Sequence, residues 1–171
     1  MKMFNVSRNA ARGPVRLLLL AIVALMVLAV EALWAGPAPG ATQIPITVYK
    51  TPNCGCCALW AEHMQENGFA VEMKSVSETQ TLRTQLGIPD HLASCHTAVV
   101  GDYWVEGHVP ADLVSRLLAE NPEHVEGIAA PGMPLGSPGM EAPNAPTYEV
   151  VTLDDRGDVE VYETVQGRRE K

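Results

Sequence analysis

Three of the four cysteines in this 171-residue chain lie within four positions, in the segment Thr-Pro-Asn-Cys-Gly-Cys-Cys at residues 51–57. Adjacent cysteines leave the main chain in different directions, so a disulfide between Cys56 and Cys57 would be strained. Cys54 and Cys57 have the C-x-x-C spacing, which can close a disulfide or chelate one ion at a strand-to-helix turn. The cluster therefore predicts a metal site, a redox site or both at such a turn.

The sequence after the cluster predicts a helix from about Cys56 to Glu66, ended by Asn67-Gly68. Thiolates in the first turn of a helix feel its positive end and lose their protons more easily. Such thiolates are nucleophiles and soft-metal ligands. Among the first-row ions Cu(I) prefers them most, with zinc next.

Two other interpretations of the cysteines stay open. Four cysteines can form two structural disulfides in a secreted domain, although a bridge among the first three would close almost no loop and add little stability. A four-cysteine zinc site is the second alternative. Such sites usually consist of two separate C-x-x-C pairs, whereas here Cys95 would have to supply the fourth ligand alone.

The first 35 residues have the pattern of an export signal. An uninterrupted apolar run of 14 residues at 17–30 is preceded by four basic residues, Lys2, Arg8, Arg12 and Arg16. After the run, Ala35 offers a small residue for cleavage before Gly36-Pro37. The run is short for a membrane-spanning helix. An uncleaved N-terminal anchor is the alternative, and it would be the chain's one contact with a membrane. We therefore predict a periplasmic location, where free cysteines oxidise unless a metal or a reductant protects them.

The chain is acidic, with a formal net charge of −8. It has no basic stripe to meet phosphates, which argues against nucleic acid as a partner. Cleavage after Ala35 would leave eight basic and nineteen acidic residues. This charge suits an exported protein that handles cations.

The rest of the chain alternates between strand and helix patterns. Strands are predicted at 44–50, 69–76, 97–100 and 103–108, and further helices from 77 or 79 to 86 and from about 110 to the Asn121-Pro122 pair. Residues 88–91 predict a turn. Residues 127–146, rich in Gly and Pro, predict an ordered loop or linker without regular structure. Residues 148–153 and 159–163 predict a terminal hairpin.

This order predicts an α/β domain in which the first two strands pair in parallel. It resembles the thioredoxin-like fold, a mixed sheet flanked by helices, here with an extra C-terminal β-hairpin. We predict a signal peptide or anchor at 1–35, a linker at 36–43, the thioredoxin-like copper-binding domain at 44–165 and a polar tail at 166–171. In that fold the loop before the third strand packs against the cysteine turn, so we expect Cys95 beside the other three cysteines.

Several segments together resemble the CopG-type family of exported, thioredoxin-like, copper-associated proteins. The matching segments are residues 49–57, Trp60, His63-Met64, Cys95-His96-Thr97, residues 105–111, and the Gly/Pro/Met segments 131–134 and 136–140. The resemblance covers roughly residues 44–165, and the cysteine set shows no departure. It implies copper binding at the four cysteines, a role in copper resistance and a redox function linking Cu(I) and Cu(II).

Our candidate copper ligands are Cys54, Cys56, Cys57 and Cys95, whose thiolates could bridge a small cluster of Cu(I) ions. Cys54 and Cys57 are also the candidate redox-active pair, with a disulfide between them as an oxidised state. The acidic residues are expected to form a solvated face, and Trp60 to pack in the core or at its rim.

Five further residues are weaker candidates for metal binding. His63, about two turns along the helix, is either a group behind the ligands or an exposed helix histidine. We expect His96 to point away from Cys95, as successive residues of an extended segment do. His108 either binds metal or caps the following helix. Met133 and Met140 offer thioethers to Cu(I) or fill gaps between a loop and the core.

The resulting hypothesis is a periplasmic copper-binding protein of copper homeostasis, with oxidoreductase activity on copper left open. Two rivals remain. One is a thiol–disulfide oxidoreductase that acts on protein. The other is a passive metallochaperone that passes copper to an exporter or to another periplasmic copper-handling protein.

Overall fold

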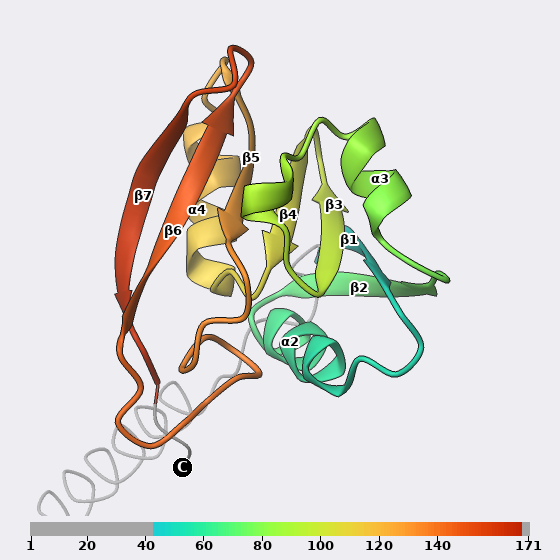
Figure 1. Cartoon of the computed structure of the whole chain (residues 1–171), viewed down its shortest axis with the longest axis vertical. Coiled ribbons are helices and arrows are strands. Elements are labelled where there is room, and N and C mark those ends of the chain that lie inside the picture. The colour runs from blue at the N-terminus through green and yellow to red at the C-terminus, as the bar shows by residue number, and fades with distance from the viewer. Residues whose placement is uncertain (1–42, 169–171) are drawn as a thin grey trace, which may run out of the picture. The chain divides into compact units, whose positions relative to one another are not determined.

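The computed structural model describes residues 43–168 (Figure 1). The predicted signal segment, the linker up to residue 42 and the last three residues of the predicted tail lie outside this part of the chain. No helix between residues 43 and 168 combines the length and the apolar character needed to cross a membrane.

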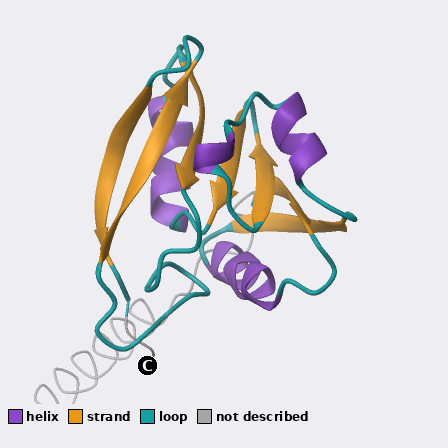
Figure 2. Cartoon of the chain, viewed as in Figure 1, coloured by secondary structure: helices purple, strands orange, loops and turns teal. Residues whose placement is uncertain are grey.

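Seven strands form one mixed sheet in the order β2-β1-β3-β4-β5-β6-β7 (Figures 1 and 2). The strands are β1 (Ile44–Lys50), β2 (Phe69–Ser75), β3 (His96–Val100), β4 (Tyr103–Gly107), β5 (Val125–Ala130), β6 (Thr147–Asp154) and β7 (Val159–Gln166). β1 pairs with β2 in parallel, and β3 runs antiparallel to both β1 and β4. This arrangement of the first four strands is that of a thioredoxin-like fold, so the predicted class is confirmed.

Three α-helices and a 3-10 helix connect these strands. They are α2 (Gly55–Glu66), α3 (Gln80–Gln85), η1 (Asp90–Leu92) and α4 (Ala111–Glu120). The bounds of the three α-helices agree with the predicted ones to within a residue or two, because stop residues with positive φ (Gly68, Gly87 and Asn121) mark where they end. The predicted turn at 88–91 overlaps η1.

The prediction that residues 127–146 lack regular structure is wrong for their first four positions. These belong to β5, which pairs in parallel with β4 and antiparallel with β6, and so joins the thioredoxin-like strands to the C-terminal hairpin. Gly127 lies directly against the ring of Trp104, where a side chain has no room. A glycine inside a strand often marks such a close approach.

The predicted C-terminal hairpin is formed by β6 and β7 and ends later than expected. β7 continues through Gln166, beyond the predicted boundary at 165. The Arg168 N–H then donates to the Gly136 carbonyl at 2.8 Å, and the Gly167 N–H donates to the Pro146 carbonyl at 3.2 Å. The end of β7 is thereby tied to the loop between β5 and β6.

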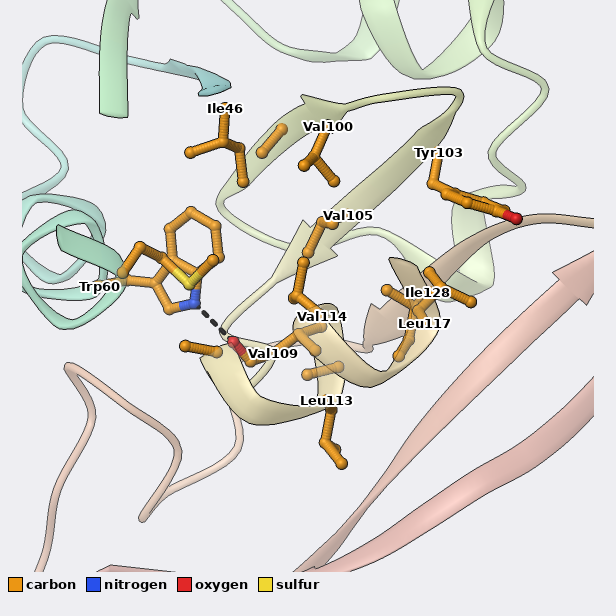
Figure 3. Close-up of a cluster of buried hydrophobic side chains, with 14 of the residues drawn as sticks. Ile46, Trp60, Val100, Tyr103, Val105, Val109, Leu113, Val114, Leu117 and Ile128 are labelled. Carbon is orange, nitrogen blue, oxygen red and sulfur yellow. Dashed lines mark hydrogen bonds between the residues drawn. The ribbon is translucent and has the colours of Figure 1, made fainter. Parts of the chain in front are cut away.

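The sheet is covered by apolar side chains on both faces. On one face α2 and α4 enclose the larger core, where Trp60 of α2 donates from Nε1 to the Val109 carbonyl at 2.8 Å (Figure 3). On the other face the α3–η1 segment covers a smaller cluster that includes Leu92 and Trp104. Trp60 is fully buried, as expected of core packing.

We predict that Gly127→Ala destabilises the domain by about 1–3 kcal/mol, because the added methyl group would overlap the Trp104 ring and force it to move. Urea unfolding followed by tryptophan fluorescence measures this change. Gly55→Ala is the matched control, since its new methyl group would meet no atom within 4 Å. Equal stability of the two variants would contradict the packing explanation.

Candidate metal centre

The cysteine turn joins the end of β1 to the start of α2. Lys50, the last residue of β1, is buried, and its Nζ donates to the carbonyls of Thr51 (2.9 Å) and Pro52 (3.2 Å). The Cys54 N–H donates back to the Thr51 carbonyl at 3.2 Å. Cys54 occupies the N-cap of α2 without a capping side-chain hydrogen bond. The loop is therefore held by hydrogen bonds to main-chain carbonyls.

The four cysteine sulfurs converge at this turn. They lie within 4.8 Å of one another, and the Cys95 Sγ is 3.5 Å from the Cys57 Sγ and 3.9 Å from the Cys56 Sγ. Cys57 is buried and the other three cysteines are half-buried. The expectation that the fold brings Cys95 beside the early cysteines is confirmed.

Cys54 and Cys57 are joined by a disulfide, with their Cα atoms 5.5 Å apart. Cys56 and Cys95 carry the free thiols. The C-x-x-C spacing allowed this pairing, and the adjacent Cys56–Cys57 pair does not form one. The structure thus corresponds to an oxidised state of the four-sulfur group.

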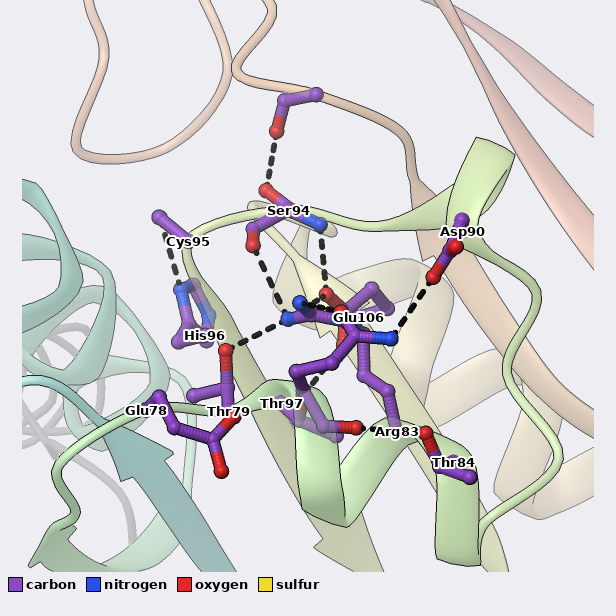
Figure 4. Close-up of polar contacts among 12 residues, drawn as sticks. Glu78, Thr79, Arg83, Thr84, Asp90, Ser94, Cys95, His96, Thr97 and Glu106 are labelled. Carbon is purple, nitrogen blue, oxygen red and sulfur yellow. Dashed lines mark hydrogen bonds and ion pairs between the residues drawn. The ribbon is translucent and has the colours of Figure 1, made fainter.

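A buried carboxylate fixes the segment that carries Cys95. Glu106 of β4 is fully buried, and its Oε1 accepts the Ser94 N–H at 2.6 Å while its Oε2 accepts the Thr97 hydroxyl at 2.6 Å (Figure 4). These two bonds lie on either side of Cys95 and His96 in the chain. They hold the short stretch that presents the fourth sulfur.

The charge of Glu106 is balanced by Arg83 of α3, whose Nη1 lies 3.6 Å from Oε1. Arg83 is itself held by Thr79 at 2.6 Å and by Gln80 at 2.8 Å. Burial raises the pKa of the Glu106 carboxyl, and the hydrogen bonds from Thr97 and Ser94 together with the Arg83 guanidinium oppose that rise. The expectation that the acidic residues form a solvated face is wrong for Glu106.

His108 faces the fourth sulfur, with its Nε2 3.1 Å from the Cys95 Sγ. Its Nδ1 lies 2.8 Å from the Pro138 carbonyl, which can only accept, so Nδ1 carries the proton. Nε2 therefore points a lone pair at the thiol. Burial lowers the pKa of this fully buried imidazole, which favours its neutral form, while the Pro138 hydrogen bond and the Glu141 charge oppose that shift.

His96 also faces Cys95, so the expectation that it points away is wrong. Its Nδ1 lies 3.4 Å from the Cys95 Sγ, and its ring packs against Trp60 with centroids 4.4 Å apart. Cys95 lies at a bend just before β3 begins at His96, so the two residues are not successive positions of one extended strand. Burial, and next the neighbouring His108, lower the pKa of this imidazole well below its usual value.

The loop between β5 and β6 covers the site from a third direction. Gly132 forms an isolated bridge with Ser94 and accepts from the Ser94 hydroxyl, and Pro138 accepts from His108. Gly139 lies so close to the first turn of α2 that a Cβ there would be 2.9 Å from the Cys56 carbonyl. This loop, residues 131–141, is called the strap below.

The remaining weaker candidates lie around the site rather than within it. His63 Nε2 accepts the Ala111 N–H at 3.1 Å and so serves the first turn of α4. Burial, followed by the Arg168 charge, lowers the pKa of His63. Met133 is exposed and lines an open depression of about 400 Å³ with Cys95. Met140 is half-buried at the end of the strap, where its N–H donates to the Ser137 carbonyl.

The donor set fits a soft metal ion. Four thiolates are typical ligands of Cu(I) and zinc, and two imidazole nitrogens stand beside them. Burial, and next the neighbouring Cys56, raise the pKa of the Cys95 thiol to about 12, so without a metal this thiol stays protonated near neutral pH. A bound cation removes that proton, because coordination deprotonates a thiol outright.

Comparison with known proteins agrees with this geometry. Two solved structures titled copper resistance protein CopG, in Forms 1 and 2, are each 38% identical to the chain with a TM-score of 0.68. The matches cover 72–73% of this chain and 98–99% of theirs. The chain belongs to the CopG family. The family resemblance stated from the sequence is confirmed.

Two further comparisons add less to this assignment. Residues 92–140 of this CopG-family chain also match a family model described as a protein of unknown function, DUF411. That segment runs from η1 through Cys95, His108 and the strap. No curated protein sequence matches the chain.

Sequence reasoning did not identify Glu106, Arg83 or Pro138 as residues that build the site. Glu106 and Pro138 lie within segments 105–111 and 136–140, which carry the family resemblance, but that resemblance gave neither residue a role. Arg83 had no such signal, because Glu106, whose charge it balances, is distant in the chain.

We predict that Glu106→Gln destabilises the domain by about 2–4 kcal/mol, since it leaves the Arg83 charge buried without its partner and replaces one acceptor by a donor. Urea unfolding measures the loss. Adding Arg83→Met to this variant removes the orphaned charge and should recover part of the stability. A loss below about 0.5 kcal/mol for Glu106→Gln would show that the pair does not hold the Cys95 segment.

Proposed function

We propose that this protein binds Cu(I) through Cys54, Cys56, Cys57 and Cys95 as part of copper resistance, with copper as its substrate rather than a permanent cofactor. The observation that carries the proposal is the convergence of four sulfurs within 4.8 Å. Solved relatives that span this domain are titled copper resistance proteins, which supports copper over other soft ions.

Crowding of the sulfurs favours a small cluster over a single ion. Three ligands come from one helical turn and the fourth from a separate segment, and the strap limits their movement. Thiolates can bridge two Cu(I) ions each, so four sulfurs can hold more than one ion. A single tetrahedral zinc ion usually takes two separate cysteine pairs, which makes zinc the weaker candidate.

We also propose that the Cys54–Cys57 pair reduces Cu(II). Two thiols would give two electrons to two Cu(II) ions, yielding two Cu(I) ions, one disulfide and two released protons. The disulfide between these residues supports this step, because the fold accommodates the bonded pair at this turn. A dithiol reductant from the surroundings would have to reopen the disulfide for another cycle.

The two rival functions differ from this proposal in what they require. A thiol–disulfide oxidoreductase acting on proteins would exchange disulfides without copper. A metallochaperone would pass Cu(I) on to an exporter or another copper-handling protein and would not change its oxidation state. The basic, apolar pattern of residues 1–35 supports work in the periplasm, where either rival would also operate.

We predict that the fully reduced protein binds more than one Cu(I) ion per chain. Cys95→Ser should bind fewer ions, and its affinity for Cu(I) should fall roughly tenfold or more. Titration against a coloured Cu(I) chelator under argon measures both quantities. Met73→Leu is the control, because it removes an exposed sulfur on edge strand β2. Unchanged binding in Cys95→Ser would exclude a four-sulfur site.

We predict that the reduced protein converts two Cu(II) ions to Cu(I) while two thiols per chain disappear. The Cu(II) signal in electron paramagnetic resonance (EPR) and a thiol count after acid quenching follow the two changes. Cys54→Ser and Cys57→Ser should each slow this conversion at least tenfold, because neither variant can close the Cys54–Cys57 disulfide. Equal conversion by wild type and both variants would contradict the assigned redox pair.

A further inference from the structure

A second group of metal-binding atoms adjoins the four cysteines and shares one of them. The Cys95 Sγ, one His96 nitrogen and one His108 nitrogen lie within 4.8 Å of one another. The Sγ is 3.4 Å from His96 Nδ1 and 3.1 Å from His108 Nε2. Ligands bound to one ion at about 2.0–2.3 Å stand roughly 3–4 Å apart, so one ion could bridge these three atoms.

His108 is already oriented as a metal ligand. An imidazole that binds a metal through one nitrogen almost always donates its other N–H to a carbonyl, a carboxylate or water. The Pro138 carbonyl of the strap receives the Nδ1–H at 2.8 Å, and Nε2 is left facing the sulfur. No rotation of the ring is needed to bind an ion there.

His96 carries the second independent indication. Its side chain is fully buried, and among residues 43–168 its Nε2 makes no hydrogen bond, although the Gly107 carbonyl is near the ring. Buried polar atoms without partners are rare in proteins and call for an explanation. The ring packs on Trp60 and edge-on to His108, which keeps Nδ1 toward Cys95. Nδ1, the other ring nitrogen, lies 3.4 Å from the Cys95 Sγ and is the atom available to a metal ion there.

Two of the three donor atoms in this group are imidazole nitrogens, whereas the four-cysteine group offers only sulfurs. Imidazole nitrogens suit divalent copper, and among divalent first-row ions Cu(II) binds such sites most tightly, whereas thiolates alone select Cu(I). The Cys54–Cys57 disulfide removes two sulfurs from the four-cysteine set but none of the atoms of the Cys95–His96–His108 group. The oxidised protein therefore keeps this second group intact.

We propose that Cys95, His96 and His108 bind one Cu(II) ion in the form of the protein that carries the Cys54–Cys57 disulfide. The inference rests on the proposed copper function and extends it, since it gives the divalent ion its own ligands. Because Cys95 belongs to both groups, a Cu(II) ion bound by Cys95, His96 and His108 would lie next to the four-cysteine site proposed for Cu(I).

The test uses the Cys56→Ser protein with its disulfide closed, which leaves Cys95 as the sole thiol. Cu(II) alone is added at up to one equivalent, and samples are frozen at once to limit reduction by the thiol. We expect one bound Cu(II) per chain, a thiolate-to-copper charge-transfer absorption band, and EPR couplings from two nitrogen nuclei.

Two substitutions separate ligation from packing. His96→Phe keeps a ring against Trp60 and loses no hydrogen bond at Nε2. His108→Asn keeps an N–H near the Pro138 carbonyl and removes the nitrogen that faces Cys95. Each should weaken Cu(II) binding at least tenfold and remove one nitrogen coupling, while His124→Asn, an exposed histidine near the β6–β7 turn, should change neither.

Cu(I) titration of the reduced variants and their thermal unfolding accompany these measurements. Normal folding and Cu(I) binding with lost Cu(II) binding would support the assignment. Absence of the thiolate band in Cys56→Ser, or unchanged nitrogen couplings in both histidine variants, would overturn it while the Cu(I) function stands. Failure of the reduced wild type to bind Cu(I) would instead reject the proposed function itself.

Discussion

The site depends on one buried carboxylate, that of Glu106. A charged group without solvent exposure is stable only when its lone pairs are satisfied and its charge is balanced, and here a main-chain N–H, a hydroxyl and the Arg83 guanidinium meet that need. The N–H and the hydroxyl belong to Ser94 and Thr97, which flank Cys95 and His96, whereas the guanidinium comes from α3. The same interactions that make the burial of Glu106 tolerable therefore set the position of the fourth sulfur.

Three separate segments meet around that sulfur. The turn from β1 into α2 brings three cysteines, the segment before β3 brings Cys95, and the strap sets the direction of His108 through Pro138. The thioredoxin-like part of the chain supplies the first two segments. The third comes from the extension that begins at β5, so β5 is structurally important as the link that carries the chain back over the site.

Much of the framework could be predicted from sequence because its signals are local. Alternation marks β1 and β2, stop residues mark α2, and the thioredoxin-like order alone places Cys95 near the cysteine turn. The strand β5 was not predicted because Gly127 and the alanines at 129 and 130 have low strand preference, and the need for Gly127 comes from its contact with the Trp104 ring. The burial of Glu106 and the direction of His96 depend on tertiary partners, and no periodic pattern reports such partners.

The residues that build the metal site lie far apart in the sequence, and this separation has a thermodynamic consequence. Cys57 and Cys95 are separated by 38 residues, and His108 and Pro138 by 30. An unfolded chain retains the early trio of thiols but not the full pocket, so copper would bind the native state far better than the denatured one. By mass action the ion then stabilises the whole domain, and conversely any remote substitution that loosens the domain weakens its hold on the ion. Metal load and conformational stability should rise and fall together in this protein.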